Sequence, residues 1–165
     1  MSEPRELHAY DYVPLAYERV REALRSDAAG LFQRATVTAA SRAEDVVAHL
    51  SVAMGAIEIG ADVKIQVHYV SEETSALGER TTRLELSWSA TRAAGLFPSM
   101  QATFSIYPLS ATETQLDLSG RYRPPLGLVG NAVDALVGHR VAEASVLRFV
   151  QDVRARLETE LGHSR

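Results

Sequence analysis

The sequence contains no cysteine. Disulfide bonds, thiolate nucleophiles and cysteine metal ligands are therefore excluded. Lysine is almost as scarce, and the single Lys64 falls on the polar side of a predicted strand, so a Schiff-base lysine is not expected. The chain also lacks a run of about 18–20 apolar residues, the length that a membrane-spanning helix needs. Residues 1–6 are polar with no apolar run behind them, so no signal peptide is expected.

Several kinds of site are missing as well. His8, His49, His68 and His163 show no metal-binding spacing, so no metal is expected. The sequence has no nucleophile-elbow, Walker or dinucleotide-binding motif, so no cofactor is expected either. The net charge of −4 and the pI of about 5.7 argue against a nucleic-acid partner, which would need a basic face. A cytoplasmic protein is the expectation.

What is present is enough apolar side chain for a packed core. Hydrophobic residues make up 46% of the 165 residues, which is typical of a globular chain rather than a disordered one. No linker or repeat divides the sequence. We therefore expect a single domain over residues 1–165.

The end of the chain predicts one long helix. No proline occurs from Leu128 to Leu161, and apolar residues recur there at steps of three and four, the spacing of one helical face. These apolar residues are Leu128, Ala132, Ala135, Val146, Phe149, Val150, Val153 and Leu157. At 100° per residue, His139 and Glu143 fall on the same stripe, and their spacing of four lets the side chains meet. We expect both to face the surface that the helix covers.

The preceding hundred residues predict that surface. Apolar residues alternate with polar ones, which indicates antiparallel strands with one apolar face. Six such segments are expected at residues 33–40, 46–54, 57–69, 84–90, 100–106 and 116–122. A two-residue turn at Gly55-Ala56 would join the second and third of these and bring their apolar side chains to one face. The expected pairs are Met54 with Ile57, Val52 with Ile59 and Ala48 with Val63.

The first thirty residues predict a strand and two short helices. Leu7–Val13 suits the strand, and Pro14 opens a helix that ends near Ser26. Asp27 is expected to cap a second helix, which Gly30 ends after about one turn. The apolar face of the first helix holds Val13, Tyr17, Val20 and Leu24.

This order of elements, together with two local stretches, resembles a known family. The stretches are the strand-Val13-Pro14-helix opening, and Tyr122–Gly127 leading into the helix that carries His139–Ala144. The chain resembles the helix-grip proteins, also called START-like, Bet v 1-like or SRPBCC proteins, which include polyketide cyclases, lipid-transfer domains and CoxG-like bacterial members. The resemblance implies an α+β fold in which a curved seven-stranded antiparallel sheet wraps around the C-terminal helix. It implies an apolar ligand between sheet and helix, and no universal catalytic motif.

Our leading expectation is that the protein binds or transports a small hydrophobic ligand such as a lipid, polyketide or isoprenoid. The expected ligand-binding residues lie on the apolar strand face, the apolar loop before Pro98 and the final helix. They are Met54, Leu86, Trp88, Phe97, Met100, Phe104, Tyr122, Leu128, Ala132, Ala135, His139 and Glu143. The large side chains among them would equally fill a closed core.

Two alternatives stay open at this point. His139 and Glu143 are the candidate catalytic residues of a polyketide cyclase or aromatase, acting as acid and base, although the same pair could simply satisfy itself structurally. The third hypothesis is an interaction module with a filled core, which contacts a membrane or a protein through Leu96 and Phe97. A homodimer is compatible with each of these. Enzymatic activity is not favoured by any motif.

Overall fold

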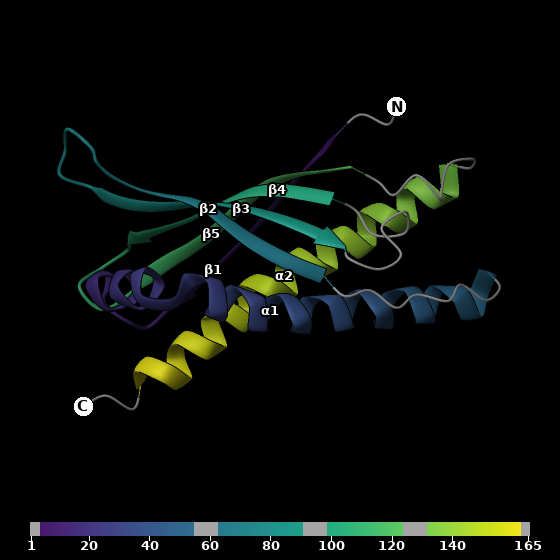
Figure 1. The fold of residues 1–165 in the computed structure, drawn as a ribbon, viewed down its shortest axis with the longest axis horizontal. Coiled ribbons are helices and arrows are strands. Elements are labelled where there is room, and N and C mark those ends of the chain that lie inside the picture. Colours follow the sequence, from purple (N-terminus) through teal and green to yellow (C-terminus); the bar gives the residue numbers. More distant parts are fainter. Residues whose placement is uncertain (1–3, 55–62, 91–98, 124–131, 163–165) are drawn as a thin grey trace.

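Five antiparallel strands and two long helices make up the described part of the chain. The structure, a computed structural model, describes residues 4–54, 63–90, 99–123 and 132–162. In chain order the elements are β1 (Arg5–Val13), α1 (Tyr17–Met54), β2 (Val63–Thr74), β3 (Arg80–Ala90), β4 (Ser99–Pro108), β5 (Thr114–Arg123) and α2 (Ala132–Gly162). The strands form one sheet in the order β1-β5-β4-β3-β2, and both helices lie on one side of it (Figure 1).

The expected α+β fold class is confirmed. An antiparallel sheet packs against a long C-terminal helix, which is the helix-grip arrangement. The apolar face predicted for the second half of this helix is also confirmed, because Val146, Phe149, Val150, Val153 and Leu157 are all buried. This face covers the sheet from the side on which the strands carry their apolar residues.

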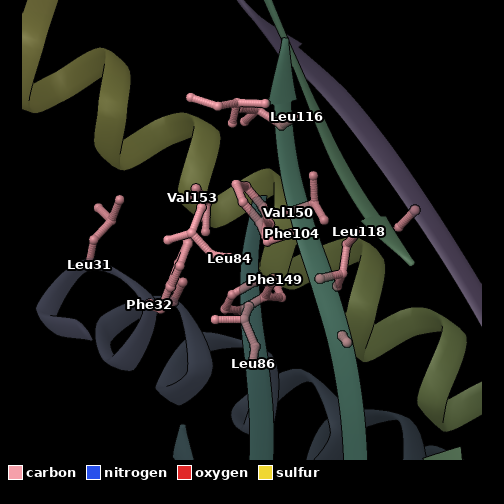
Figure 2. Packing of buried hydrophobic residues seen from close by; sticks show 14 of the residues in the cluster. Leu31, Phe32, Leu84, Leu86, Phe104, Leu116, Leu118, Phe149, Val150 and Val153 are labelled. Carbon is pink, nitrogen blue, oxygen red and sulfur yellow. The ribbon is translucent and has the colours of Figure 1, made fainter. Parts of the chain in front are cut away.

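The predicted facing of the last three strands is confirmed as well. The sheet face that meets the helices, here called the inner face, carries the alternate apolar residues of β3, β4 and β5. The buried ones are Leu84, Leu86, Trp88, Ala102, Phe104, Ile106, Leu116, Leu118 and Tyr122. Figure 2 shows several of these side chains directed toward residues of α1 and α2, including Phe32 and Phe149.

The two strands expected at residues 33–40 and 46–54 are wrong. Both segments belong to α1, which runs to Met54, so the expected pair of Ala48 with Val63 does not form, and Val63 pairs with Ala90 instead. Ile57 and Ile59, the expected partners of Met54 and Val52, lie outside the described residues. The segment is rich in alanine and contains neither glycine nor proline between Gly30 and Gly55. Alanine is the strongest helix former, and short alternating apolar runs fit a helix as well as a strand. The expected count of seven strands is accordingly corrected to five among the described residues. The Gly55-Ala56 turn lies outside them.

The two short helices expected before residue 33 are instead parts of the single kinked helix α1. The kink lies at Asp27, whose φ of −153° and ψ of 53° are not helical. The Asp27 carboxylate accepts a hydrogen bond from the Gly30 backbone N–H at 3.0 Å, so it caps the second part of α1 as predicted. Gly30 does not end that part. It stands in its first turn, where a Cβ would lie 2.4 Å from the Asp27 carboxylate.

The alternation expected through Tyr69 is broken by a bulge in β2. Ile65 opposes Trp88 and Val67 opposes Leu86, but the register shifts between Val67 and Tyr69. Tyr69 therefore opposes Glu85, a residue of the outer face. A bulge of this kind adds one residue to a strand and reverses the facing of the residues after it.

Polar contacts fasten α1 to the sheet. The Tyr17 hydroxyl lies 2.6 Å from the Thr82 hydroxyl, and both residues are buried. On the surface, Arg21 holds Glu72 of β2 through two hydrogen bonds of 2.7 and 2.9 Å. Gln33 accepts a hydrogen bond from the Ile65 backbone N–H at 3.1 Å, which covers part of the free edge of β2.

Candidate functional site

A row of five side chains crosses the inner face of the sheet near one end. Strand pairing places Arg5 opposite Tyr122, Tyr122 opposite Met100, Met100 opposite Trp88, and Trp88 opposite Ile65. Each of these residues stands within two positions of the described end of its strand. We call this set, Arg5, Tyr122, Met100, Trp88 and Ile65, the terminal row.

The terminal row changes in character from one edge of the sheet to the other. Arg5 on β1 is exposed and charged, and Tyr122 beside it is only 1% exposed. Met100 is half-buried, and Trp88 and Ile65 are buried. A molecule lying along this row would therefore meet a polar end at β1 and β5 and an apolar surface from β4 to β2.

Tyr122 is the electrostatic centre of the polar end. Burial raises the pKa of its phenol above the usual value, and the nearby carboxylate of Glu143 on α2 also raises it. Arg5 opposes these effects, because its guanidinium charge and its hydrogen bond to the phenol favour the ionised form. Arg5 on β1 and Glu143 on α2 thus both act on the pKa of Tyr122 on β5.

An aromatic cluster fills the space behind the terminal row. The ring centroids of Trp88 and Phe149 are 5.1 Å apart, those of Phe32 and Phe104 are 5.0 Å apart, and those of Phe32 and Phe149 are 5.7 Å apart. Edge-to-face geometry at these separations is typical of a tightly packed core. Leu86 and Phe104, which were expected to bind ligand, are fully part of this packing.

The catalytic pair expected on α2 is placed only in part. His139 lies on α2, and its side chain is outside the described residues. Glu143 is exposed, although it was expected to face the sheet. The buried face of α2 centres on Val146 and Val153, and at 100° per residue Glu143 stands about 60° from that centre, at the edge of the covered stripe. It is nevertheless close enough to act on Tyr122.

The remaining expected ligand-binding residues are described only in part. Phe97 and Leu128, together with Leu96, fall outside the described residues. Met54 ends α1 and Ala132 and Ala135 belong to the first turns of α2, but their side chains are outside the described part. Their contact with a ligand stays a prediction.

A hollow lies on the outer face of the sheet. This groove of about 470 Å³ is lined mainly by polar side chains, among them His8, Glu85, Thr103 and Arg121. Several of these groups pair with one another: Thr103 donates to Glu85 at 3.1 Å, and His8 lies 2.7 Å from Asp117.

Metal and membrane sites are not found in the part of the chain that the structure describes. Within residues 4–54, 63–90, 99–123 and 132–162, no group of three or more potential metal ligands converges. None of the helices described over those ranges combines the length and apolar character needed to cross a membrane.

Reasoning from the sequence missed Arg5 and Phe32. Arg5 shares the inner-face parity of Leu7 and Ala9 on β1, but Asp11 breaks the alternation and hid the facing of this strand. Phe32 was placed between a short helix and a strand, whereas α1 carries it into the aromatic cluster. Both errors arose where a local pattern had more than one interpretation.

Comparison with known proteins shows the fold. No protein-family model matches the chain, and no curated protein matches it in sequence. Among solved structures, the aromatase/cyclase Zhui from Streptomyces sp. R1128 aligns over 96% of both chains with a TM-score of 0.52 and 12% identity. A conserved protein from Geobacillus kaustophilus aligns over 94% of this chain and 97% of its own, with a TM-score of 0.49 and 9% identity.

A plant enzyme is similar at a lower score. Norcoclaurine synthase from Thalictrum flavum, solved with dopamine and hydroxybenzaldehyde, aligns over 99% of this chain and 90% of its own with a TM-score of 0.46 and 10% identity. The fold assignment rests on the aromatase/cyclase, whose match covers nearly the whole of both chains. Together with the sheet order and the packed C-terminal helix, it shows that the chain has the Bet v 1-like, or START-like, helix-grip fold.

Proposed function

We propose that this protein binds a small hydrophobic molecule against the terminal row, between the sheet and the first half of α2. The observation that carries the proposal is the composition of the row itself. Trp88, Ile65 and Met100 form an apolar surface on the inner face, and it ends at a buried phenol. Burial of apolar area on such a surface contributes about 25 cal/mol per Å² before the costs of ordering the ligand.

The packing of the core limits where the site can lie. The second half of α2, from Val146 to Leu157, packs with the sheet and α1 in one hydrophobic cluster. A guest molecule therefore belongs on the other side of the aromatic cluster. In Figure 1 the first half of α2 and the second half of α1 both extend past the sheet at the end where the terminal row lies. His139, Ala132 and Ala135 are our proposed contacts on α2, and Met54 on α1.

A neutral fluorescent dye tests the proposal directly. Trp88 is the only tryptophan, so energy transfer from it to N-phenyl-1-naphthylamine reports a dye bound near the terminal row. Met100→Lys should weaken dye binding about tenfold or more, because it introduces a charge into an apolar surface. Gln101→Lys makes the same charge change on the same strand but on the outer face, and it should leave binding unchanged.

Two results would overturn the proposal. One is equal dye affinity in wild-type protein and the Met100→Lys variant. The other is a wild-type protein that shows no dye binding and releases no small molecule on organic extraction after native mass spectrometry. A co-purifying lipid, polyketide or isoprenoid lost in Met100→Lys would support it.

The filled aromatic cluster favours one second candidate, an interaction module without a ligand. The space between the sheet and the two helices is filled by aromatic side chains, as a closed core would require. These are Phe32, Phe104, Phe149 and Trp88. This hypothesis predicts an empty protein in native mass spectrometry and a complex that depends on Leu96 and Phe97. Replacing both with serine should then reduce the mass of the complex measured by light scattering.

A further inference from the structure

The two edge strands of the sheet, β1 and β2, are covered to different degrees. β2 carries a bulge, and Gln33 of α1 accepts a hydrogen bond from its Ile65 N–H at 3.1 Å. β1 pairs with β5 over all nine of its residues without a register shift, and no described strand lies along its other side. A regular edge strand with unpaired backbone groups is a template for pairing with another strand.

The hydrogen-bond pattern shows which residues of β1 direct their backbone groups away from β5. The Leu109 N–H donates to the Glu113 carbonyl oxygen at 2.9 Å where β4 turns into β5, so Glu113 faces β4. Successive residues of a strand direct their N–H and C=O groups alternately to the two sides. The even-numbered residues of β5 therefore face β1, where their partners are odd-numbered. The even-numbered residues of β1 face outward, and these are Glu6, His8, Tyr10 and Tyr12.

Both ends of this outward edge are closed. The Tyr12 N–H donates to the Asp11 carboxylate at 2.8 Å, which agrees with its facing away from β5. Arg154 of α2 crosses the edge at the same point, because its guanidinium lies 3.7 Å from that carboxylate and 5.7 Å from the centre of the Tyr12 ring. At the other end, Pro4 has no N–H to donate. The part of the edge that stays open is Glu6–Tyr10, which we call the open edge.

The open edge is complementary to a second copy of itself. In an antiparallel pair with a two-fold axis at His8, Glu6 of each copy lies opposite Tyr10 of the other, and the two His8 residues lie opposite each other. Each of these pairs exchanges two backbone hydrogen bonds. Every outward N–H and C=O of the open edge then has a partner.

Other registers leave backbone groups unpaired. A two-fold axis one residue earlier sets Tyr10 against Pro4, which has no N–H. An axis one residue later sets Glu6 against Tyr12, whose N–H is already occupied by the Asp11 carboxylate. The register centred on His8 uses the whole open edge.

The side chains also fit this register. On the inner face, Arg5 comes to lie opposite Asp11 of the second copy, so opposite charges face each other at both ends of the pair. On the outer face, Tyr10 is 63% exposed and lies beside His8, with ring centroids 5.9 Å apart. A second copy covers part of this aromatic surface, which otherwise faces solvent.

We propose that the protein forms a two-fold homodimer in which the open edge of β1 pairs antiparallel with the open edge of a second copy, centred on His8. The two five-stranded sheets then join into one continuous sheet. The dimer also closes an edge at which unrelated strands would otherwise add. This interface is separate from ligand binding and goes beyond the proposed function.

Sedimentation velocity over a range of protein concentrations tests the dimer. A species of about twice the 18.0 kDa of one chain should grow with concentration. Tyr10→Pro should raise the dissociation constant about tenfold or more, because each copy loses an outward N–H that the dimer uses. The monomer does not need that N–H, since proline is tolerated where an edge strand faces solvent. Tyr12→Pro is the matched control on the same strand and side, outside the open edge, and should leave the dissociation constant unchanged.

A cysteine at the two-fold axis tests the register. The chain has no cysteine, so the His8→Cys variant carries a single thiol. Opposed residues in such a pair have Cα atoms about 5.5 Å apart, which is within the range of a disulfide. Mild oxidation should link most of the His8→Cys protein into covalent dimers, seen on a non-reducing gel. His68→Cys places a thiol at an exposed position of β2 and should stay monomeric on the same gel.

Three results would overturn the proposal. The first is a wild-type protein that stays monomeric at every concentration. The second is a dimer that Tyr10→Pro does not weaken, because it then forms through another surface. The third is a His8→Cys variant that cross-links no faster than His68→Cys, and this result decides alone if Trp88 fluorescence shows that Tyr10→Pro does not fold.

Discussion

At the residue scale, the pairing of β4 with β5 requires two small residues that face each other. Gly120 on β5 and Ala102 on β4 oppose each other in the row next to the terminal row. A Cβ at Gly120 would lie 2.9 Å from the Ala102 Cβ and 3.0 Å from the Gln101 carbonyl oxygen. Opposed Cβ atoms normally stand about 4.5–5.5 Å apart, so β4 and β5 approach unusually closely on the inner face. Glycine is needed here for space, because a side chain would meet Ala102 and the backbone of β4.

Gly120→Ala should therefore destabilise the protein by about 1–3 kcal/mol, the usual cost of overpacking a well-packed site. Urea unfolding followed by Trp88 fluorescence measures the change. Gly162→Ala is the matched control, since a Cβ there meets nothing within 4 Å, and its stability should be unchanged or slightly raised. Adding Ala102→Gly to Gly120→Ala should recover part of the loss. Unchanged stability of Gly120→Ala would contradict this account of the close approach between β4 and β5.

At the element scale, α1 is tied to the β2–β3 hairpin by charge as well as by apolar packing. Arg21 makes a bidentate ion pair with Glu72, and Arg25 approaches the same carboxylate at 3.7 Å. The hydrogen bond from Arg21 is the largest cause of a lowered pKa of Glu72, and the charges of Arg21 and Arg25 add to it. The pair therefore stabilises the attachment of the first part of α1 to β2 wherever Glu72 is ionised.

The lowered pKa of Glu72 determines how the stability contributed by this ion pair changes with pH. The pKa of Glu72 in the folded protein is below its ordinary value of 4.5, so its contribution is fully present above about pH 4.5. The contribution disappears as the pH falls through the folded pKa. Glu72→Gln should thus lower the urea midpoint at neutral pH, and the difference from wild type should shrink as the pH falls below about 4.5.

The same substitution in a variant that lacks Arg21 tests whether the effect of Glu72→Gln comes from the Arg21–Glu72 ion pair. In Arg21→Gln, the substitution Glu72→Gln should have a smaller effect at neutral pH, because the main partner is already absent. Added salt should reduce the difference in wild type, since the ion pair lies on the protein surface, where dissolved ions screen it. A Glu72→Gln effect that does not shrink as the pH falls below about 4.5 would show that packing, and not charge, is responsible.

The helix-forming character of α1 is the main element-scale feature that sequence patterns did not resolve. Residues 33–54 alternate apolar and polar side chains over short distances, yet they continue the helix that Asp27 caps. Alanine can count as apolar in either a helical or a strand pattern, so it does not distinguish the two. No glycine or proline marks the end of an element before Gly55. By contrast, β3, β4 and β5 combine alternation with aromatic and β-branched residues, and there the pattern predicted both the strands and their facing.

At the scale of the whole molecule, one hydrophobic cluster joins all the elements. Buried residues of β1, α1, the other four strands and α2 belong to the same cluster, and the aromatic rings at its centre come from α1, β3, β4 and α2. Elements that share a core unfold together, because none can keep its apolar face covered alone. The single domain expected over residues 1–165 stays a prediction.

Unfolding should therefore be cooperative. Far-ultraviolet circular dichroism, which follows the helices, and Trp88 fluorescence, which follows the sheet, should give the same urea midpoint. Phe149→Ala should shift both curves together, with a loss of about 3–5 kcal/mol, because Phe149 contacts Trp88, Phe32 and Phe104. Leu147→Ala, at an exposed neighbouring position, should shift neither. Separate transitions for the two signals would show that the helices and the sheet are not one unit.

The sequence by itself determined which faces of β3, β4, β5 and α2 are buried, because those faces follow from residue periodicity, a local property that packing leaves intact. It also determined the cap at Asp27 and the absence of cysteine chemistry. The tertiary structure alone decided that residues 33–54 are helical, that Phe32 joins the aromatic cluster and that Arg5 stands beside Tyr122. The positions of Phe32 and Arg5 depend on contacts between residues far apart in the chain, which local patterns do not encode. The alternating run over residues 33–54 is compatible with either a helix or a strand, so the pattern alone did not decide between them.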